Sequence, residues 1–238
     1  MRFSFWLPVD ETWPEMRARA LRLADEGWQG LWVADNLLPR REPGGELLEA
    51  WSSLAALAAT VPGMGLGSLV SSNTYRHPAL LAKIAATVER IATGPVTLGL
   101  GAGWRPRDHE ATGIPLPPKD VRRAMLAEAL AMLRELLDGR SVTRDGPHYR
   151  PVGLTLNPLP TRRIALLLGA RSADLAARFA DAWHVWDPPE AIGRRRERLA
   201  RRCEAIDRDP GAIRILASPP LLIGNDRALV ERLRRDPE

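Results

Sequence analysis

The chain is poor in the residues that build disulfide frameworks and metal centres. Its one cysteine, Cys203, excludes an internal disulfide and any metal site made from several thiolates. The sequence has no HExxH motif and no cluster of acidic residues, so no metal is expected. It also has no GxSxG motif, the mark of a serine hydrolase. The motifs of metal-dependent and serine hydrolases are therefore both missing.

Long apolar runs are missing as well. The longest stretches, 55–61 and 164–168, are far too short to span a bilayer. The residues after Arg2 are strand-like and do not form the apolar core of a secretory leader. We therefore expect a cytoplasmic protein without a membrane partner.

Lysine is scarce, and arginine supplies most of the positive charge. Lys83 and Lys119 are the only lysines in a chain of net charge +5. The densest arginine cluster, 194–202, is interleaved with Glu197 at helical spacings that allow ion pairs. Because no nucleic-acid motif accompanies this charge, we expect no nucleic-acid partner.

Strand and helix patterns alternate along the chain, which predicts one α/β domain over residues 1–238. The predicted strands are 3–7, 30–34, 64–70, 96–100, 164–168, 182–186 and 213–217. The predicted helices are 15–26, 46–60, 78–91, 120–137, 172–180, 189–206 and 226–234. Residues 105–118 are predicted as a loop, and 139–160 as an insertion that forms a small hairpin or an extended segment.

Strands that are each followed by a helix predict a barrel. An eight-stranded (β/α) barrel typically needs about 250 residues, and here the last strand and helix are not found. We therefore predict a TIM (β/α)8-type barrel that lacks its final strand-helix unit. A doubly wound open sheet is the alternative, since seven strands fit it without a missing part.

Polar and glycine-rich residues follow several predicted strands, where parallel α/β proteins bind ligands. The Gly101-Ala102-Gly103 stretch is followed by Arg105-Pro106 and not by a helix, so it does not match the dinucleotide-binding fingerprint. It forms either a cofactor loop or an ordinary turn. The segment 169–172 joins a strand to a helix, where free N–H groups and a guanidinium suit a phosphate or carboxylate. Asp35 and Asn36 follow the predicted strand 30–34. Their carboxylate and amide either position a polar ring of a ligand or only cap a helix or turn.

The four histidines give no clear catalytic candidate. His77 and His109 lie near a helix start or in a loop, where each acts as an acid or base or simply as a cap. His148 and His184 are weaker candidates still. The catalytic residue is therefore unknown from the sequence.

Several stretches together resemble the bacterial luciferase-like monooxygenase superfamily, particularly its branch that uses the deazaflavin coenzyme F420. The matching stretches are 31–36 (LWVADN), 73–83 (NTYRHPALLAK), 98–104 (LGLGAGW), 113–115 (GIP), 169–172 (GARS) and 180–183 (ADAW). The resemblance implies a TIM barrel without a metal. It also implies F420, or as the second choice FMN, at the C-terminal mouth of the strands.

The resemblance also implies which residues hold the cofactor. In that family a bulge with a non-prolyl cis peptide often supports the back of the tricyclic ring, and the matching pair here is Leu69-Val70. The loops 101–103 and 168–171 match those that contact the cofactor tail and phosphate. The implied cofactor-binding residues are Asp35, Asn36, Leu69, Val70, Ser71, Gly101, Ala102, Gly103, Leu168, Gly169, Ala170 and Arg171.

One residue departs from the F420 pattern. Relatives often place a histidine after the acidic residue that matches Asp35, whereas this chain has Asn36. An amide cannot exchange a proton near neutral pH, so hydride transfer from the reduced cofactor is left as the main chemistry. The implied function is an oxidoreductase that transfers a hydride between F420 and a small organic substrate. The alternatives are an FMN-dependent monooxygenase and a truncated, non-catalytic cofactor-binding protein.

The end of the chain is the larger departure. Family members follow a strand like 216–223 and a helix start like Gly224-Asn225 with one more strand and helix, whereas this sequence stops at Glu238. An open barrel exposes strand edges and core side chains. We therefore expect either a homodimer, in which a neighbouring subunit covers the gap, or a truncated product of low stability and doubtful activity.

Overall fold

One parallel sheet organises the molecule, and the computed structural model describes it over residues 3–8, 10–39, 46–169, 171–186 and 189–218. The strands follow the order β1-β2-β3-β5-β6-β7-β8, with the short β4 beside β5. Their bounds are β1 Phe5–Trp6, β2 Gly30–Val33, β3 Gly65–Ser68, β4 Ser71–Ser72, β5 Val96–Gly101, β6 Ala165–Leu168, β7 Ala182–Val185 and β8 Arg214–Ala217. This spatial order repeats the chain order without a reversal, as in a (β/α) barrel and unlike a doubly wound sheet.

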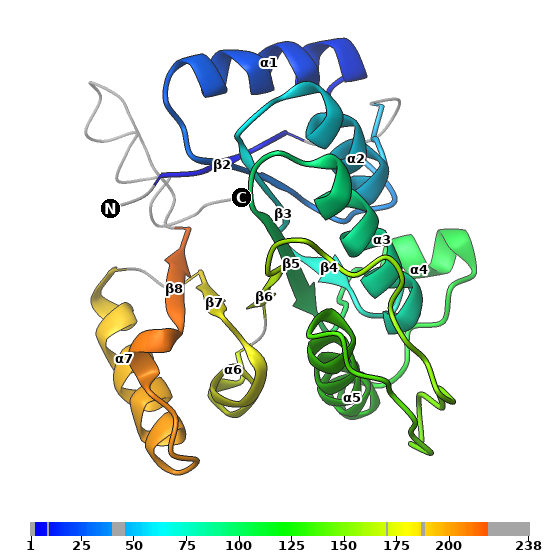
Figure 1. Cartoon of the computed structure of the whole chain (residues 1–238), viewed down its shortest axis with the longest axis vertical. Helices are drawn as coiled ribbons and strands as arrows, with labels where there is room; N and C mark the ends of the chain where they lie inside the picture. Colours follow the sequence, from blue (N-terminus) through cyan, green and yellow to red (C-terminus); the bar gives the residue numbers. More distant parts are fainter. Residues whose placement is uncertain (1–2, 9, 40–45, 170, 187–188, 219–238) are drawn as a thin grey trace.

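The helices lie along the outer face of this curved sheet (Figure 1). Their bounds are α1 Trp13–Asp25, α2 Ala50–Thr60, α3 Pro78–Ile91, α4 Pro106–Thr112, α5 Lys119–Leu137, α6 Ala173–Phe179, α7 Pro189–Glu204 and the 3-10 turn η1 Pro210–Ala212. Neighbouring helices pack together in the pairs α1–α2, α2–α3, α3–α5, α5–α6 and α6–α7. None of the helices in the described part of the chain has the length and apolar composition that spanning a bilayer requires.

Apolar side chains fill both faces of the strands, which explains why the strands read as apolar runs. The main core lies between the sheet and the helices and includes the fully buried Leu98, Leu100 and Leu130. A smaller cluster on the concave side joins Leu69, Leu167 and Ala182 with Trp32, Val70 and Leu216. The helices therefore cover the outside of the sheet, and the smaller cluster packs on its concave side.

The predicted third strand is interrupted. β3 pairs with β5 at Leu66 and Val96, and β4 pairs with β5 again at Ser71 and Leu100. The peptide bond between them, Leu69-Val70, is cis. This confirms the bond geometry that the family resemblance implied at this pair.

Two predicted boundaries differ from the structure. The predicted loop 105–118 contains helix α4, whose buried residues are the polar Asp108 and His109, so no apolar stripe marks it in the sequence. The helix predicted from residue 46 begins at Ala50 because the carboxylate of Glu49 caps it. That carboxylate accepts hydrogen bonds from the amides of Trp51 at 3.0 Å and Ser52 at 2.7 Å.

The remaining predictions concern the insertion and the end of the chain. In 139–160 an antiparallel bridge joins Val142 to Leu154 through two backbone hydrogen bonds of 2.8 and 3.0 Å. The predicted helix 226–234 and the family match at 224–225 lie outside the described residues. Within the described residues, β1 pairs only with β2 and β8 only with β7, so this part of the barrel is open.

Candidate functional site

A cavity of about 1020 Å³ lies at the C-terminal ends of the strands. Its wall begins at Trp6 of β1 and continues through the segments that follow β2, β4, β5, β6 and β7. The first turns of α5 and α6 and one residue of α7, Arg198, complete it. A parallel barrel is expected to gather its functional side chains at this end.

Most of the predicted cofactor-binding residues line this cavity. The residues that do so are Asp35, Asn36, Leu69, Val70, Ser71, Gly101, Ala102, Gly103, Gly169 and Arg171. Leu168 is fully buried in the core and is not among the lining residues. Ala170 lies outside the described residues. The structure therefore brings loops from four different strands to one wall.

Glycines make room for the Val70 side chain in this wall. A Cβ at Gly169 would lie 2.6 and 2.7 Å from the two Val70 methyl groups, and a Cβ at Gly101 would lie 2.9 Å from one of them. Real Cβ atoms do not approach that closely, so both positions need glycine while Val70 is in place. Leu69 lies beside Val70 at the same wall, which makes this part of the cavity apolar.

Asp35 is held in place by Arg76 and does not extend freely into the cavity. Arg76 donates to both oxygens of the buried Asp35 carboxylate, at 2.7 and 3.0 Å, and the Ser72 amide donates to one of them at 3.0 Å. Burial raises the pKa of Asp35, and the Arg76 hydrogen bonds oppose that rise. Arg76 also bonds Glu49, so one guanidinium ties the loop after β2 to the start of α2. Asp35 therefore positions the wall around it.

A buried hydroxyl pair fixes the other side of the interrupted strand. Trp51 Nε1 donates to Ser71 Oγ at 2.9 Å, and Ser71 Oγ donates to Ser68 Oγ at 2.9 Å. Ser68 Oγ in turn lies 3.0 Å from the carbonyl oxygen of Gly99 and 3.1 Å from its amide. The segment around Leu69 and Val70 is thereby held from both ends.

The loop after β2 is also fastened to helix α4. The Leu37 amide donates to Asp108 Oδ2 at 2.9 Å, and Arg105 donates to the Leu38 carbonyl oxygen at 3.1 Å. Tyr75, whose ring lines the cavity, donates its hydroxyl to the same Asp108 oxygen at 3.1 Å. Three loops are therefore joined at this rim by hydrogen bonds.

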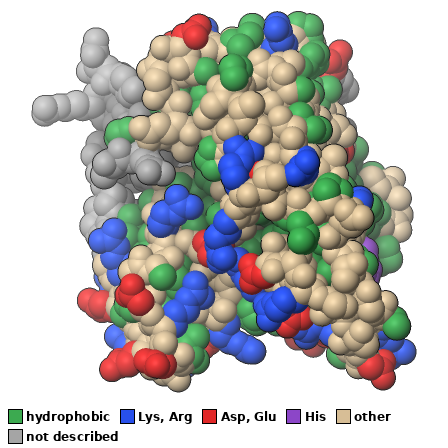
Figure 2. All heavy atoms as spheres, viewed as in Figure 1, with side chains coloured by type: hydrophobic (Ala, Val, Ile, Leu, Met, Phe, Trp, Pro, Cys, Tyr) green, Lys and Arg blue, Asp and Glu red, His purple; other side chains and the backbone are tan. Residues whose placement is uncertain are grey.

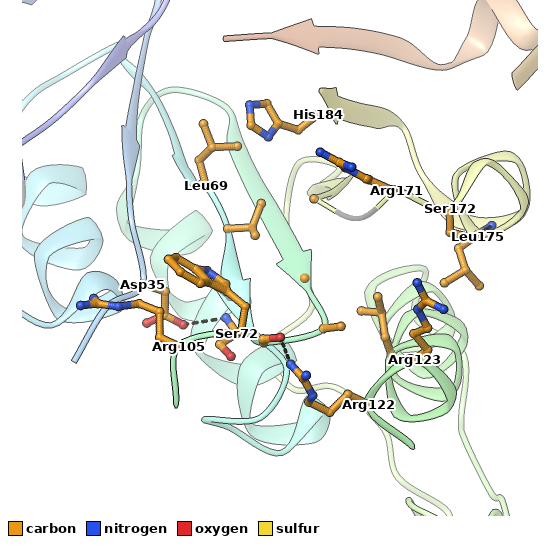
Figure 3. Close-up of a pocket in the computed structure, with 18 of the residues that line it drawn as sticks. Asp35, Leu69, Ser72, Arg105, Arg122, Arg123, Arg171, Ser172, Leu175 and His184 are labelled. Carbon is orange, nitrogen blue, oxygen red and sulfur yellow. Dashed lines mark hydrogen bonds between the residues drawn. The ribbon is translucent and has the colours of Figure 1, made fainter. Parts of the chain in front are cut away.

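One end of the cavity is strongly cationic. Figure 3 shows Arg122 and Arg123 of α5 on one side of the cavity, with Arg171 between them and His184. Arg122 is held by the carbonyl oxygens of Pro117 and Gly103. Within the described part of the chain, four further cations of the lining make no ion pair: Lys119, Arg123, Arg171 and Arg198.

Acidic side chains do not neutralise this end. The acids of the lining are Asp35, which is bonded to Arg76, and Asp174, which is bonded to Arg202 of α7 at 3.0 Å. Figure 2 shows many basic side chains, with acidic ones among them, over the half of the molecule that α5, α6 and α7 form. The cavity end next to these helices therefore attracts anions.

The opposite end is aromatic, and Arg171 and Arg195 line a smaller pocket there together with His184 and Trp186. The ring of Trp6 lies 5.0 Å from that of Trp186, measured between centroids, and His184 lies edge-on to Trp186 at 4.8 Å. Burial lowers the pKa of His184 to about 4, so its imidazole is neutral near pH 7. Its Nε2 lies 3.0 Å from Ser218 Oγ.

The two histidines first considered as acids or bases have structural partners. His77 caps α3, because its Nδ1 accepts from the Ala79 amide at 3.1 Å. His109 is buried between Thr74 Oγ1 and the Ile114 carbonyl oxygen, each 3.1 Å away. Capping, the alternative interpretation, therefore describes His77. No group of three or more metal-binding side chains occurs among the residues described.

Apart from Arg171, sequence reasoning missed the residues at the two ends of the cavity. His184 was ranked low, and Trp6 and Trp186 were read only as parts of strands. Alternation along β7 was a usable signal, since Trp183 packs into the outer core and the next residue must face the opposite side. Lys119, Arg122 and Arg123 carried no such signal, because their place at the cavity depends on where α5 starts.

Comparisons with known proteins agree with this fold. A family model described as luciferase-like monooxygenase matches residues 1–237. An F420-dependent hydroxymycolic acid dehydrogenase of Mycobacterium tuberculosis is 27% identical over 215 residues, 89% of this chain and 59% of that protein. An F420-dependent glucose-6-phosphate dehydrogenase of Beutenbergia cavernae is 34% identical over 161 residues, 66% of this chain and 48% of that protein. The chain thus spans about half the length of the curated relatives that it matches.

A solved structure shows the same architecture. An F420-dependent secondary alcohol dehydrogenase in complex with an F420-acetone adduct superposes with a TM-score of 0.83 at 20% identity. The match covers 91% of this chain and 68% of that one. At this level of identity the likeness shows the fold alone.

Proposed function

The chain belongs to the luciferase-like monooxygenase family, and from this we propose that it is an oxidoreductase that transfers a hydride between F420 and a small organic substrate. The observation that carries the proposal is the cavity with an apolar wall at Leu69-Val70 and an unpaired cationic end. F420 has a flat tricyclic ring and an anionic, phosphate-bearing tail, and each part has a matching wall.

The apolar wall suits a flat ring. Val70 fills the space left by Gly101 and Gly169, so the wall has no side chain that projects past it at those positions. Leu69 extends the same apolar surface. A tricyclic ring packed there would lose its contact with water on one face, and flat apolar contact of this kind favours binding.

The cationic end suits the tail. Arg123, Arg171 and Arg198 come from three different elements and have no acidic partner among the described residues. Arginine is well suited to phosphate because its planar guanidinium forms paired, charge-assisted hydrogen bonds. The Arg122 guanidinium donates hydrogen bonds to the carbonyl oxygens of Pro117 and Gly103, which hold it beside the Gly103 loop.

The protein's contribution to the reaction is binding and orientation. When bound, reduced F420 supplies a hydride, which is two electrons and a hydrogen nucleus, and the substrate takes up one proton as well. Asn36 cannot provide that proton, and His184 is already deprotonated near pH 7 because burial lowers its pKa to about 4. Solvent is therefore the proposed proton source, while the rim joined by Asp108 fixes the geometry.

The test is a binding experiment with both cofactors. Purified protein is titrated with F420 and with FMN, followed by the fluorescence of each cofactor. We expect F420 to bind at least about tenfold more tightly, with an affinity that falls as salt rises because the tail contacts are ionic. Tighter binding of FMN would favour the monooxygenase alternative, and binding of F420 without turnover would favour a non-catalytic binding protein.

A matched pair of variants locates the tail. Arg123→Gln removes a cavity cation and is expected to weaken F420 binding, whereas Arg90→Gln removes an exposed arginine from the outer face of α3 and should not. Equal effects of the two substitutions would contradict a tail site at this end. Glucose 6-phosphate and hydroxymycolic acid, which appear in the relatives' names, are the first substrates to assay.

Assembly and location follow the sequence-based expectations. We propose a homodimer, which the described edge strands β1 and β8 support because each pairs with one strand only. The proposed location is the cytoplasm, as the sequence predicts. Sedimentation of the purified chain measures the oligomeric state.

A further inference from the structure

A chain of hydrogen bonds connects the cavity wall to a buried histidine. Ser72, which lines the cavity and is 8% exposed, shares a hydrogen bond of 2.7 Å between its Oγ and Thr74 Oγ1. Thr74 Oγ1 in turn lies 3.1 Å from Nε2 of His109, which belongs to α4 and is 3% exposed. The segment after β4 therefore places two hydroxyl groups in series between the cavity and an imidazole.

The carbonyl oxygen of Ile114 fixes the direction of this chain. It lies 3.1 Å from His109 Nδ1 and can only accept, so Nδ1 must carry a proton. In the neutral imidazole Nε2 is then an acceptor, and the Thr74 hydroxyl donates to it. Because a hydroxyl has a single proton, Thr74 accepts from Ser72. The Ser72 oxygen keeps its lone pairs, and it accepts no hydrogen bond from the described residues.

The position of the two hydroxyls is fixed by their surroundings. The Ser72 amide donates to the buried Asp35 carboxylate at 3.0 Å, and Figure 3 shows this bond at the cavity wall. A Cβ at Gly103 would lie 2.8 Å from Ser72 Oγ and 2.5 Å from Thr74 Oγ1, so only glycine leaves both hydroxyls in place. Gly103 itself lines the cavity. Ser72 Oγ is therefore held at the surface that a bound substrate would contact.

From this geometry we propose that Ser72 exchanges a proton with the oxygen of the substrate, and that Thr74 and His109 take up and return that proton through it. Ser72 is the catalytic residue of this relay, and Thr74 and His109 are its positioning residues. The inference rests on the proposed hydride transfer and adds the route of the accompanying proton. Solvent stays the net source of the proton, because Ser72 meets the water of the cavity between turnovers.

The proton and the electrons balance in this scheme. When an alcohol is oxidised, its C–H bond breaks and the hydride leaves to oxidised F420. The O–H bond also breaks, and its proton passes to Ser72 Oγ while the Ser72 proton moves to Thr74 and the Thr74 proton moves to His109 Nε2. The products are a carbonyl compound, reduced F420 and a protonated imidazole, which returns its proton to water through the same chain. Reduction of a carbonyl compound runs these steps backwards.

The alternative is that the three side chains only fasten the segment after β4 to α4. The charged and titratable groups recorded around the imidazole are Asp108 and Arg105, which pair at 3.4 Å, and Tyr75, whose ring centroid lies 5.0 Å away. Burial raises the pKa of Tyr75 to about 13, so its hydroxyl stays protonated. A structural role predicts that cutting the chain lowers stability and leaves the pH dependence of turnover unchanged.

The direction of the relay is measured first, in the free protein. Nitrogen NMR of the whole chain labelled at histidine gives the tautomer of His109, whose signals are assigned by their loss in His109→Gln. Under mildly alkaline conditions we expect a proton on Nδ1 and none on Nε2. A proton on Nε2 alone would reverse the donors in the chain and overturn the inference.

The route is then tested with a matched pair of variants. Thr74→Val keeps the shape of the side chain and cuts the relay, whereas Thr74→Ser keeps the hydroxyl. With 2-propanol and glucose 6-phosphate as probe alcohols, Thr74→Val should lower kcat for F420 reduction at least about 100-fold and change KM less than about twofold. It should also remove the rise of kcat with pH that follows the loss of the His109 proton. Thr74→Ser should keep most of kcat, and Thr87→Val, which removes an exposed hydroxyl of α3, should match the wild type.

The outcomes separate this inference from the proposed function. F420 binding is measured on the same samples by fluorescence. An unchanged kcat and pH profile in Thr74→Val, with F420 bound as in the wild type, would overturn the relay and leave the proposed function standing. Failure of the wild type to bind F420 would instead refute the proposed function, and the relay with it, whatever the tautomer of His109.

Discussion

Replacing Gly169 by alanine tests the steric fit of the Val70 wall. The new Cβ would lie 2.6 and 2.7 Å from the Val70 methyl groups and 3.1 Å from Val70 Cβ. A valine side chain has one torsion and a stiff branch, so it cannot move aside as a long side chain does. The φ angle of Gly169 is not in the left-handed region, so the backbone itself accepts alanine. The cost of the substitution therefore comes from the clash.

The size of that cost follows from packing data. Inserting a methyl group into a filled site typically costs about 1–3 kcal/mol, and two close contacts place Gly169→Ala near the middle, at about 2 kcal/mol. Removing the Val70 methyl groups should relieve most of it. In a Val70→Ala background we expect Gly169→Ala to cost less than about 1 kcal/mol, because both methyl groups are gone. The 3.1 Å contact to the Cβ of residue 70 accounts for the cost that is left.

The measurement is urea unfolding of the wild type, both single variants and the double variant. Gly193→Ala is the control, because nothing lies within 4 Å of its added Cβ on helix α7. That variant should keep or raise the free energy of unfolding, by up to about 1 kcal/mol. Equal costs of Gly169→Ala with valine and with alanine at position 70 would refute the reasoning, since the cost would then not depend on those methyl groups.

Two further predictions concern buried charge. Arg76→Ala leaves the fully buried Asp35 carboxylate without its ionic partner and should lower the free energy of unfolding by about 3–5 kcal/mol, with a smaller loss in Arg76→Lys. Urea unfolding measures both variants, and a loss below about 1 kcal/mol in Arg76→Ala would contradict the pairing. Folding lowers the pKa of His184 from 6.5 to about 4, so its contribution to the free energy of unfolding is complete above pH 6.5 and is lost, by up to about 3 kcal/mol, as the pH falls to 4. Unfolding measured across this pH range should show that loss in the wild type and not in His184→Gln.

Periodicity predicted the elements with an apolar face well. Helix α3 was predicted at 78–91 and is found there, because Pro78 starts it and a continuous apolar stripe defines it. Helix α4 was predicted as a loop because its buried side chains, Asp108 and His109, are polar and its seven residues carry no stripe. Their burial is stabilised by hydrogen bonds from distant loops, which a local pattern cannot reveal.

The candidate site was predicted in part for the same reason. Loops that follow strands are recognisable one by one, so the segments at Asp35, Val70 and Gly101 were all assigned to one place. What each side chain contacts there was not predictable. Asp35 was expected to hold a cofactor, and its two oxygens are bonded to Arg76, 41 residues later, and to the Ser72 amide. Such pairs depend on how the sheet curls, not on spacing along the chain.

The contact between Trp6 and Trp186 also bears on the order in which the walls of the cavity form during synthesis. Val70 and Gly101 lie close together in the sequence, and the pairing of their strands can form early, whereas Gly169 completes the wall later. The aromatic end joins the first strand to a residue beyond β7 and needs most of the chain to have left the ribosome. A nascent chain can therefore complete the wall at Val70 before Trp186 is made, while Trp6 still lacks its partner.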